Sequence, residues 1–346
     1  MSSGYQAVMW NRAKYIYDAI LLLGVAAYIS GFMYIGAQLH PPKNAPEWID
    51  LRIRAFGTCA FLMLTIILSI GPLARLNPKF LPLLYNRRHF GVLTFFIAAF
   101  HAWSMAEWFA IQNALPNLVH EFFDWPNYLK FIGFPFKTLG LSALVILLLM
   151  AATSHDYWLN FLGPPAWKAL HMAIYVAYGL VVLHVMLGAV QDDRGLFIPL
   201  LLGISASVVA LLHLLAGWRE RGIDRGKAGA SDGWLMVGPP QSIPDKGARI
   251  VAAPGGERIA VFRDGKTVGA LTNLCAHQNG PIGEGRIIDG LVTCPWHGYQ
   301  YQLKNGCAPP PFTEKLATYP VRLRNGMIEV NPRPLAAGTE AAIELM

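Results

Sequence analysis

The stretch CAHQNGPIGEGRIIDGLVTCPWHGYQY, residues 275–301, holds two closely spaced pairs of potential metal ligands. Cys275 and His277 form the first pair, and Cys294 and His297 form the second after sixteen intervening residues. Two thiolates with two imidazoles suit a [2Fe–2S] cluster with the cysteines on one iron and the histidines on the other. The alternative is a structural zinc site, but zinc ribbons usually carry two cysteines two residues apart on both sides, and a Cys-x-His pair is rare there.

The residues around the ligands point to a particular family. The run Cys294-Pro-Trp-His-Gly-Tyr-Gln-Tyr, followed by Gly306 and Tyr319-Pro-Val, resembles the Rieske domains of ferredoxins and ring-hydroxylating oxygenases. From residue 234 onward, short β-type runs alternate with turn residues, and Asp264-Gly is a hairpin signal. We therefore predict a small all-β Rieske domain, with both ligand pairs on loops at one tip.

The rest of the chain is too apolar for an ordinary soluble protein. Of its 346 residues, 54% are hydrophobic and only 14% are charged, and the mean hydropathy is +0.38. Several uncharged runs are long enough to cross a hydrocarbon core of about 30 Å as helices. The predicted transmembrane helices cover residues 16–39, 53–74, 88–110, 137–154, 167–190 and 195–218.

These patterns predict a multi-domain protein, an α-helical six-helix transmembrane bundle followed by the β domain. The predicted parts are a membrane domain over 1–218, a linker over 219–233, the Rieske domain over 234–334 and a tail over 335–346. The first helix carries no small-residue cleavage site after it, so we expect it to be retained rather than removed as a signal peptide.

The distribution of basic residues predicts the orientation in the membrane. With the N-terminus in the cytoplasm, the cytoplasmic segments hold more Lys and Arg than the opposite ones, although Arg52 and Arg54 argue the other way. We expect a bacterial inner-membrane protein with both termini in the cytoplasm. The formal net charge of +7 follows from this bias and requires no nucleic-acid partner.

The cluster motif also predicts a reduction potential. High-potential Rieske proteins carry a disulfide beside the cluster, and the resemblance places Gly280 and Trp296 where its cysteines would stand. The hydroxyl donor that often follows the second histidine is missing as well, although Tyr299 or Tyr301 could supply one. Fewer hydrogen bonds stabilise the reduced cluster less, so we expect a potential in the lower half of the range of about −150 to +300 mV. Cys307 lies outside the motif and is interpreted as an ordinary small residue.

Histidines inside the predicted spans form a second pattern. His89 and His101 on the third helix are about 18 Å apart along the axis, and His171 and His184 on the fifth are about 20 Å apart. The third and fifth helices run in the same direction, so the four histidines could form two layers that each hold a haem iron. A hydrogen bond to a neighbouring helix is the alternative for each one, and it is our interpretation of His213.

The membrane part resembles a known family through a series of spaced residues. They are Arg87-Arg88-His-Phe-Gly91, Phe95, His101, Thr153-Ser154, Leu162-Gly163, Trp167, Leu170-His171, Tyr175 and His184. This pattern, over about residues 50–218, resembles the ferric reductase-like transmembrane family, which includes ferric reductases, NADPH oxidases and the haem-binding subunit of a periplasmic methionine sulfoxide reductase system. The resemblance implies haem b ligation by His101, His171 and His184. His89 departs from the bacterial pattern, so one haem between His101 and His184 is implied more directly than a second.

The absence of several sequence motifs excludes some functions. The chain has no G-x-G-x-x-G or P-loop motif, and no mononuclear iron site of two histidines and a carboxylate follows the Rieske motif. We therefore predict an oxidoreductase component without its own flavin or nicotinamide site. Electrons would pass from a cytoplasmic flavoprotein reductase or ferredoxin through the cluster and one or two b haems. The acceptor on the other side would be a periplasmic redox protein, ferric iron or oxygen.

Two other functions remain open at this point. A quinol oxidoreductase would send electrons the opposite way, from haem to the cluster and a soluble partner, although a low-potential cluster is a poor quinol oxidant. A redox sensor would report the state of the cluster to a partner, although the sequence shows no output domain.

Overall fold

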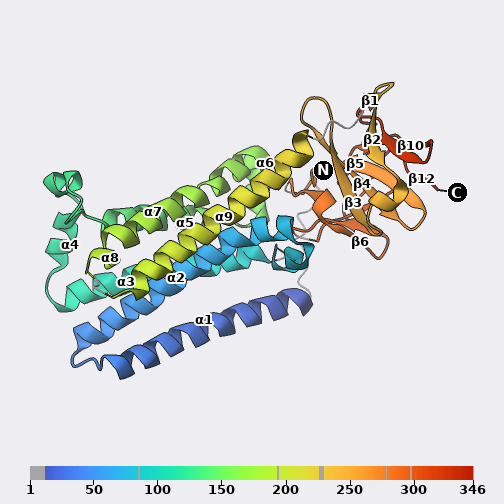
Figure 1. Cartoon of the computed structure of the whole chain (residues 1–346). Helices are drawn as coiled ribbons and strands as arrows, with labels where there is room; N and C mark the ends of the chain where they lie inside the picture. The colour runs from blue at the N-terminus through green and yellow to red at the C-terminus, as the bar shows by residue number, and fades with distance from the viewer. Residues whose placement is uncertain are drawn as a thin grey trace. The chain divides into compact units, whose positions relative to one another are not determined.

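The computed structural model describes residues 12–84, 86–192, 195–225, 230–277, 279–296 and 298–345. The chain folds into two compact units (Figure 1). Unit 1 comprises residues 1–69 and 86–211, and unit 2 comprises residues 70–85 and 212–346. Part of the predicted linker, residues 226–229, lies outside the described residues.

The described N-terminal part consists of helices and the loops that connect them. Its α-helices are α1 (Arg12–Leu39), α2 (Ala45–Leu76), α3 (Arg87–Ile111), α4 (Leu115–Glu121), α5 (Lys137–Ala152), α6 (Asp156–Met172), α7 (Ile174–Leu187), α8 (Ala189–Asp192) and α9 (Phe197–Arg225). Two 3₁₀ helices connect them, η1 (Pro78–Leu84) and η2 (Trp125–Leu129). Gly163 kinks α6, because its φ of 75° lies in the left-handed region that favours glycine.

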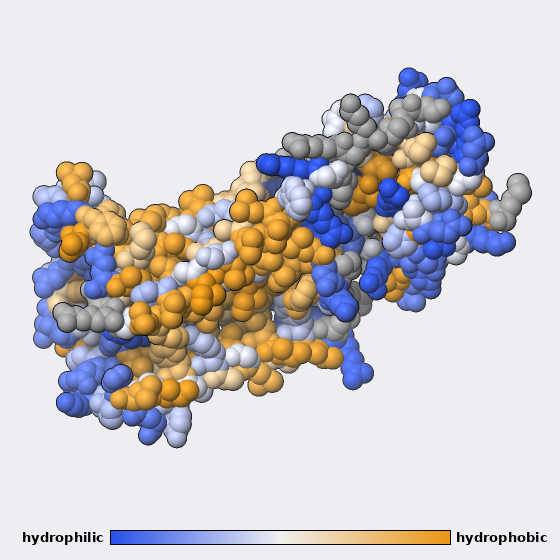
Figure 2. Space-filling model, in the orientation of Figure 1, coloured by the Kyte–Doolittle hydropathy of each residue, from blue (hydrophilic) through white to orange (hydrophobic). Residues whose placement is uncertain are grey.

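The helical part is an integral membrane structure. Among the described residues, five helical segments are long and apolar enough to cross a membrane, over residues 14–39, 45–76, 87–111, 166–191 and 197–222. The predicted span at 137–154 instead forms α5, a 16-residue apolar helix that is about 24 Å long. Figure 2 shows apolar surface over the helices. Large apolar side chains of the helices, such as Leu23 and Leu214, are exposed. Lipid tails would cover such a surface.

The core of unit 1 lies between the helices α2, α5, α7 and α9. Phe61 on α2 stacks on Tyr178 of α7, with ring centroids 5.9 Å apart and planes 9° apart. Leu64 of α2 and Leu147 of α5 are buried in the same cluster. These contacts hold α2, α5 and α7 around the interior that the histidines line.

The C-terminal part is an all-antiparallel β domain. Its strands are β1 (Ala230–Ser231), β2 (Trp234–Gly238), β3 (Gly247–Ala252), β4 (Arg258–Asp264), β5 (Thr267–Thr272), β6 (Arg286–Ile288), β7 (Leu291–Thr293), β8 (Gln300–Gln302), β9 (Thr318–Tyr319), β10 (Val321–Arg324), β11 (Met327–Val330) and β12 (Ile343–Glu344). They form sheets in the orders β1-β2-β11-β10, β12-β5-β4-β3 and β6-β7-β8, and β9 also pairs with β5. Short 3₁₀ turns lie at Pro240–Ser242 (η3) and Ile282–Glu284 (η4).

Two predictions about this domain can be compared with the structure directly. The hairpin signal is confirmed, because Asp264 pairs with Thr267 where β4 turns into β5, and Gly265 has a φ of 58°. The predicted tail is not detached from the domain. Ile343 pairs with Val268 of β5, and it packs with Leu345 against the apolar core of the sheets, because burying these side chains removes them from water.

Candidate functional site: a cluster loop pair and a histidine-lined membrane cavity

Two short loops of unit 2 carry the predicted cluster ligands. The first follows β5, and the second connects β7 to β8. Each closes on itself through a backbone hydrogen bond of 2.8 Å, from Cys275 N to the Gly280 carbonyl and from Cys294 N to the Tyr299 carbonyl. The two cysteines are only 1% and 2% exposed, and they belong to the apolar cluster between the sheets and the loops. Each sulfur is therefore held on a tight turn and shielded from water.

The two loops approach each other closely at Gly280. A Cβ atom at this position would lie 2.8 Å from the Cys294 sulfur and 3.2 Å from the Trp296 ring. Gly280 and Trp296, the positions of the missing disulfide, are thus neighbours across the loops. The absence of a side chain at Gly280 lets the second loop pack directly against the first.

Tyr301 is the hydroxyl donor that the sequence left undecided. Its oxygen accepts the Ala276 N–H at 3.1 Å, so its own hydrogen is directed to the Cys275 sulfur, 3.2 Å away. Burial and the adjacent Cys275 raise the pKa of Tyr301, which keeps the hydroxyl protonated. The other candidate, Tyr299, donates to Glu314 instead.

His277 lies beside the same tyrosine pair. Its ring stacks on Tyr299, with centroids 5.0 Å apart and planes 11° apart. His297 lies outside the described residues. Without it, no group of three or more His, Cys, Asp or Glu side chains gathers around one point in the described part of the chain. The fit to a [2Fe–2S] cluster therefore rests on the two buried sulfurs, the stacked histidine and the tyrosine donor.

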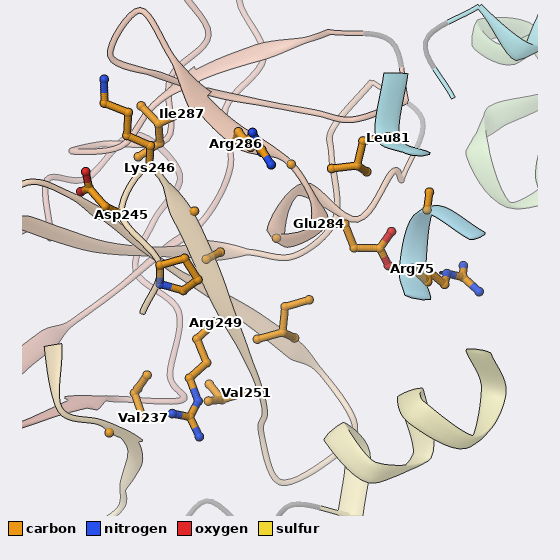
Figure 3. Close-up of a pocket in the computed structure, with 18 of the residues that line it drawn as sticks. Arg75, Leu81, Val237, Asp245, Lys246, Arg249, Val251, Glu284, Arg286 and Ile287 are labelled. Atoms are coloured by element: carbon orange, nitrogen blue, oxygen red, sulfur yellow. Dashed lines mark ion pairs between the residues drawn. The ribbon is translucent and has the colours of Figure 1, made fainter. Parts of the chain in front are cut away.

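Unit 2 also contains a cavity with a volume of about 1540 Å³ (Figure 3). Glu284 of η4 faces Arg75 at the end of α2, with its Oε1 atom 3.5 Å from Arg75 Nε. Burial raises the pKa of Glu284 to about 7, against the opposing effect of the Arg75 charge. Arg219 donates to the carbonyls of Arg75 and Leu76, each at 2.8 Å, and so caps the end of α2.

The membrane part contains a cavity of about 480 Å³ inside unit 1. Side chains of α2, α3, α5, α7 and α9 line it, and most are apolar or small. His101 of α3 and His184 of α7 both line it, with ring centroids 6.3 Å apart and planes at 88°. The structure thus brings together two histidines that are 83 positions apart in the sequence.

This separation fits two imidazoles on one metal ion. A metal–nitrogen bond of about 2 Å, with the nitrogen about 1.2 Å from the ring centre, places two opposed rings roughly 6.4 Å apart. The volume and the apolar lining also suit a bound prosthetic group. The predicted pairing of His101 with His184 is therefore geometrically sound for a haem iron.

Hydrogen bonds select the nitrogen that would bind the metal. His101 Nδ1 lies 2.9 Å from the Ile53 carbonyl, and His184 Nδ1 lies 2.9 Å from the Phe136 carbonyl. A carbonyl only accepts, so Nδ1 must carry the proton and Nε2 keeps its lone pair. Metal-binding histidines are oriented in this way. His171 shows the same arrangement, because its Nδ1 lies 3.0 Å from the Trp167 carbonyl and its buried Nε2 has no hydrogen-bond partner among the described residues.

Sequence reasoning missed two glycines that make room for the histidine rings. A Cβ at Gly57 of α2 would lie 2.9 Å from His101 Nδ1, and a Cβ at Gly140 of α5 would lie 2.8 Å from His184 Nδ1. Both glycines are in helix interiors, where glycine costs about 1 kcal/mol relative to alanine. A glycine kept in a helix interior despite this cost was the available sequence signal that another group packs closely against the helix there.

His89 and His171 have separate partners in the structure. His89 Nδ1 lies 2.7 Å from Asp18 Oδ2. His171 stacks on Trp167 with centroids 3.7 Å apart, and the Arg88 guanidinium lies 5.6 Å from the Trp167 ring centroid. Asp18 is a further residue that the sequence did not single out, since its carboxylate comes from α1.

Comparisons with known proteins agree with the division of the chain into a membrane part and a β domain. A model of the ferric reductase like transmembrane component matches residues 54–182, and a model of the Rieske [2Fe-2S] domain matches residues 233–320. The protein-methionine-sulfoxide reductase heme-binding subunit MsrQ of Herminiimonas arsenicoxydans is 31% identical over 187 residues, which cover 53% of this chain and 79% of the relative. MsrQ of Bordetella pertussis is 33% identical over 199 residues, 56% of this chain and 86% of the relative.

The β domain has relatives of its own. The anthranilate 1,2-dioxygenase ferredoxin subunit of Burkholderia cepacia is 40% identical over 80 residues, which cover 22% of this chain and 72% of the relative. With the family matches and the two MsrQ proteins, this similarity accounts for both parts of the molecule. The chain belongs to the ferric reductase-like transmembrane family, with a membrane part similar to MsrQ, and it carries a Rieske [2Fe-2S] domain after its membrane part.

Proposed function

We propose that this protein carries electrons across a membrane, from a cytoplasmic donor to an acceptor on the other side. The single observation that carries the proposal is the His101–His184 pair. The two ring centroids are 6.3 Å apart, and both side chains line a cavity among the membrane helices. The same chain holds buried Cys275 and Cys294 in a Rieske domain. A haem and a [2Fe–2S] cluster each exchange single electrons when bound. A chain with both suits electron transfer rather than hydride chemistry.

We assign the ligands as follows. Cys275, His277, Cys294 and His297 would hold the [2Fe–2S] cluster. His101 and His184 hold one haem b through Nε2, because both Nδ1 atoms are engaged by carbonyls.

A second haem b between His89 and His171 is also part of the proposal. Its support is the orientation of the two rings, since Asp18 engages the Nδ1 atom of His89 and the Trp167 carbonyl engages that of His171. The buried Nε2 of His171 is consistent with a metal ligand.

The topology is proposed to comprise six crossings, with both termini in the cytoplasm of a bacterium and the protein in its inner membrane. The short helix α5 supplies the sixth crossing, because it contributes Gly140 and Leu147 to the cavity among the longer helices. A bilayer accommodates a short span by thinning locally. The excess of Lys and Arg in the cytoplasmic segments supports the orientation.

The direction of flow is proposed to run from the cluster to the haem. One tyrosine hydroxyl contacts the Cys275 sulfur, and Gly280 and Trp296 occupy the place of a disulfide, so the cluster should have a low potential. A flavoprotein reductase or a ferredoxin is the proposed donor. A periplasmic redox protein, ferric iron or oxygen is the proposed acceptor.

A potentiometric titration of the purified protein tests this function. The haem is followed by its visible absorption and the cluster by its electron paramagnetic resonance. We expect the cluster potential to lie below, or close to, that of the haem. A cluster potential well above the haem potential would exclude the proposed direction. His101→Ala and His184→Ala should each abolish binding of the haem that this pair holds, while the cluster signal persists.

A further inference from the structure

The two sides of the membrane cavity repeat each other in sequence. Residues 53–64 read IRAFGTCAFLML, and residues 136–147 read FKTLGLSALVIL. Four pairs of residues, each 83 positions apart, have matching roles. The pairs are Ile53 and Phe136, Arg54 and Lys137, Gly57 and Gly140, and His101 and His184.

The residues at matching positions also make the same contacts in the structure. The first residue of each half supplies the carbonyl that binds its histidine at 2.9 Å, Ile53 for His101 and Phe136 for His184. The glycine four positions later lies under the same ring. The pair α2–α3 and the pair α5–α7 therefore form two equivalent halves around the cavity.

The basic residue of each half follows directly after the anchoring carbonyl. Arg54 and Lys137 both line the cavity together with His101 and His184. Haem b has a matching shape, because its two propionate carboxylates lie on one edge and are related by an approximate twofold axis through the iron. Arg and Lys bind carboxylates through charge-assisted hydrogen bonds.

We propose that Arg54 and Lys137 bind the two propionates of the haem held by His101 and His184, one from each half of the repeat. This inference rests on the haem site of the proposed function and adds the groups that orient the ligand. The two histidines and the two cations that would hold an iron porphyrin in this cavity are related by the same pseudosymmetry.

Carboxylates of the protein already hold both cations in place. Arg54 Nε lies 3.1 Å from Asp50 Oδ2, and Lys137 Nζ lies 2.7 and 2.8 Å from the two oxygens of Glu121. Asp50 also lines the cavity. A guanidinium has five N–H donors and an ammonium three, so either group can contact more than one acceptor. The side chain of Lys137 is 18% exposed and that of Arg54 is 48% exposed, so the larger effect is expected at Lys137.

The chain offers a matched control in Arg52. It lies on α2 two residues before Arg54, and its guanidinium pairs with Glu107 at 2.5 Å. It is not among the residues that line the cavity in the described part of the chain. Loss of its charge should therefore leave haem binding unchanged.

The test compares haem with an analogue whose two propionate groups carry no charge. Full-length apoprotein in detergent is titrated with iron protoporphyrin IX and with its dimethyl ester, whose propionates cannot ionise, and binding is followed in the Soret band. Lys137→Gln should weaken binding of the free acid about tenfold, and Arg54→Gln should weaken it by a smaller factor. Both variants should bind the ester as the wild type does, which also shows that they are folded. Arg52→Gln should match the wild type with both ligands.

The outcomes separate this inference from the function it rests on. If the two variants bind the free acid as tightly as the wild type, or lose the acid and the ester equally, the propionate assignment is wrong and the haem site stands. If the wild type binds neither ligand, or if His184→Ala binds both as well as the wild type does, the haem site itself is refuted, and this inference with it.

Discussion

Replacing Tyr301 by phenylalanine should lower the reduction potential of the cluster. The tyrosine hydroxyl accepts the Ala276 N–H at 3.1 Å and donates to the Cys275 sulfur at 3.2 Å. Reduction adds negative charge to the cluster and its thiolates, so a donor to sulfur stabilises the reduced form more than the oxidised one. Phenylalanine keeps the ring in its buried position and removes only the hydroxyl, which is both this donor and the acceptor of the Ala276 N–H.

The size of the change follows from the strength of the lost bond. A hydrogen bond to a charged group contributes about 1.5–3 kcal/mol. If roughly half of that distinguishes the two oxidation states, the potential falls by about 30–65 mV, since a one-electron couple shifts by 59 mV for each tenfold change in equilibrium constant.

The assay is a redox titration of the full-length protein followed by electron paramagnetic resonance of the reduced cluster. Tyr299→Phe is the matched control, because this hydroxyl donates to Glu314 rather than to a sulfur. Its potential should change less than that of Tyr301→Phe. If Tyr301→Phe has the wild-type potential while the cluster content is unchanged, the hydroxyl does not stabilise the reduced cluster and the reasoning is refuted.

Three other substitutions test different parts of the structure. Gly140→Ala places a methyl group 2.8 Å from His184, which should displace the ring and reduce the bound haem per protein, measured by the pyridine haemochrome assay; unchanged haem content would contradict the close contact. Gly280→Ala places a methyl group 2.8 Å from the Cys294 sulfur, so iron content of the isolated protein should fall, whereas haem should not. Burial raises the pKa of Glu284 to about 7, so near neutral pH the folded state binds more protons than the unfolded state. The stability of the folded state should therefore fall as pH rises from about 4.5 through 7. Thermal unfolding should show that Glu284→Gln removes this slope and stabilises the protein by at most roughly 3 kcal/mol above pH 7, and an unchanged slope would show that this carboxyl titrates normally.

Much of the fold was predictable because it depends on local patterns. A transmembrane helix satisfies its own backbone hydrogen bonds, so its apolar length is visible along the chain. The Asp264-Gly hairpin is likewise a short-range feature. The segment at 137–154 was predicted as a span from its apolar length, but it forms α5, a helix of 16 residues that is shorter than the five long apolar helices of the described residues.

The sequence by itself predicted the chemistry of this protein: the spacing of Cys275, His277, Cys294 and His297 predicts a [2Fe–2S] cluster, and histidines in apolar runs predict haem. Only the tertiary structure decided how those groups are held. It identified Tyr301 rather than Tyr299 as the sulfur donor, and it showed which carbonyls orient the histidines. The reason is physical, since ligand types are properties of single residues. Their orientation depends on atoms of other helices and strands, which only the packed chain brings within hydrogen-bonding distance.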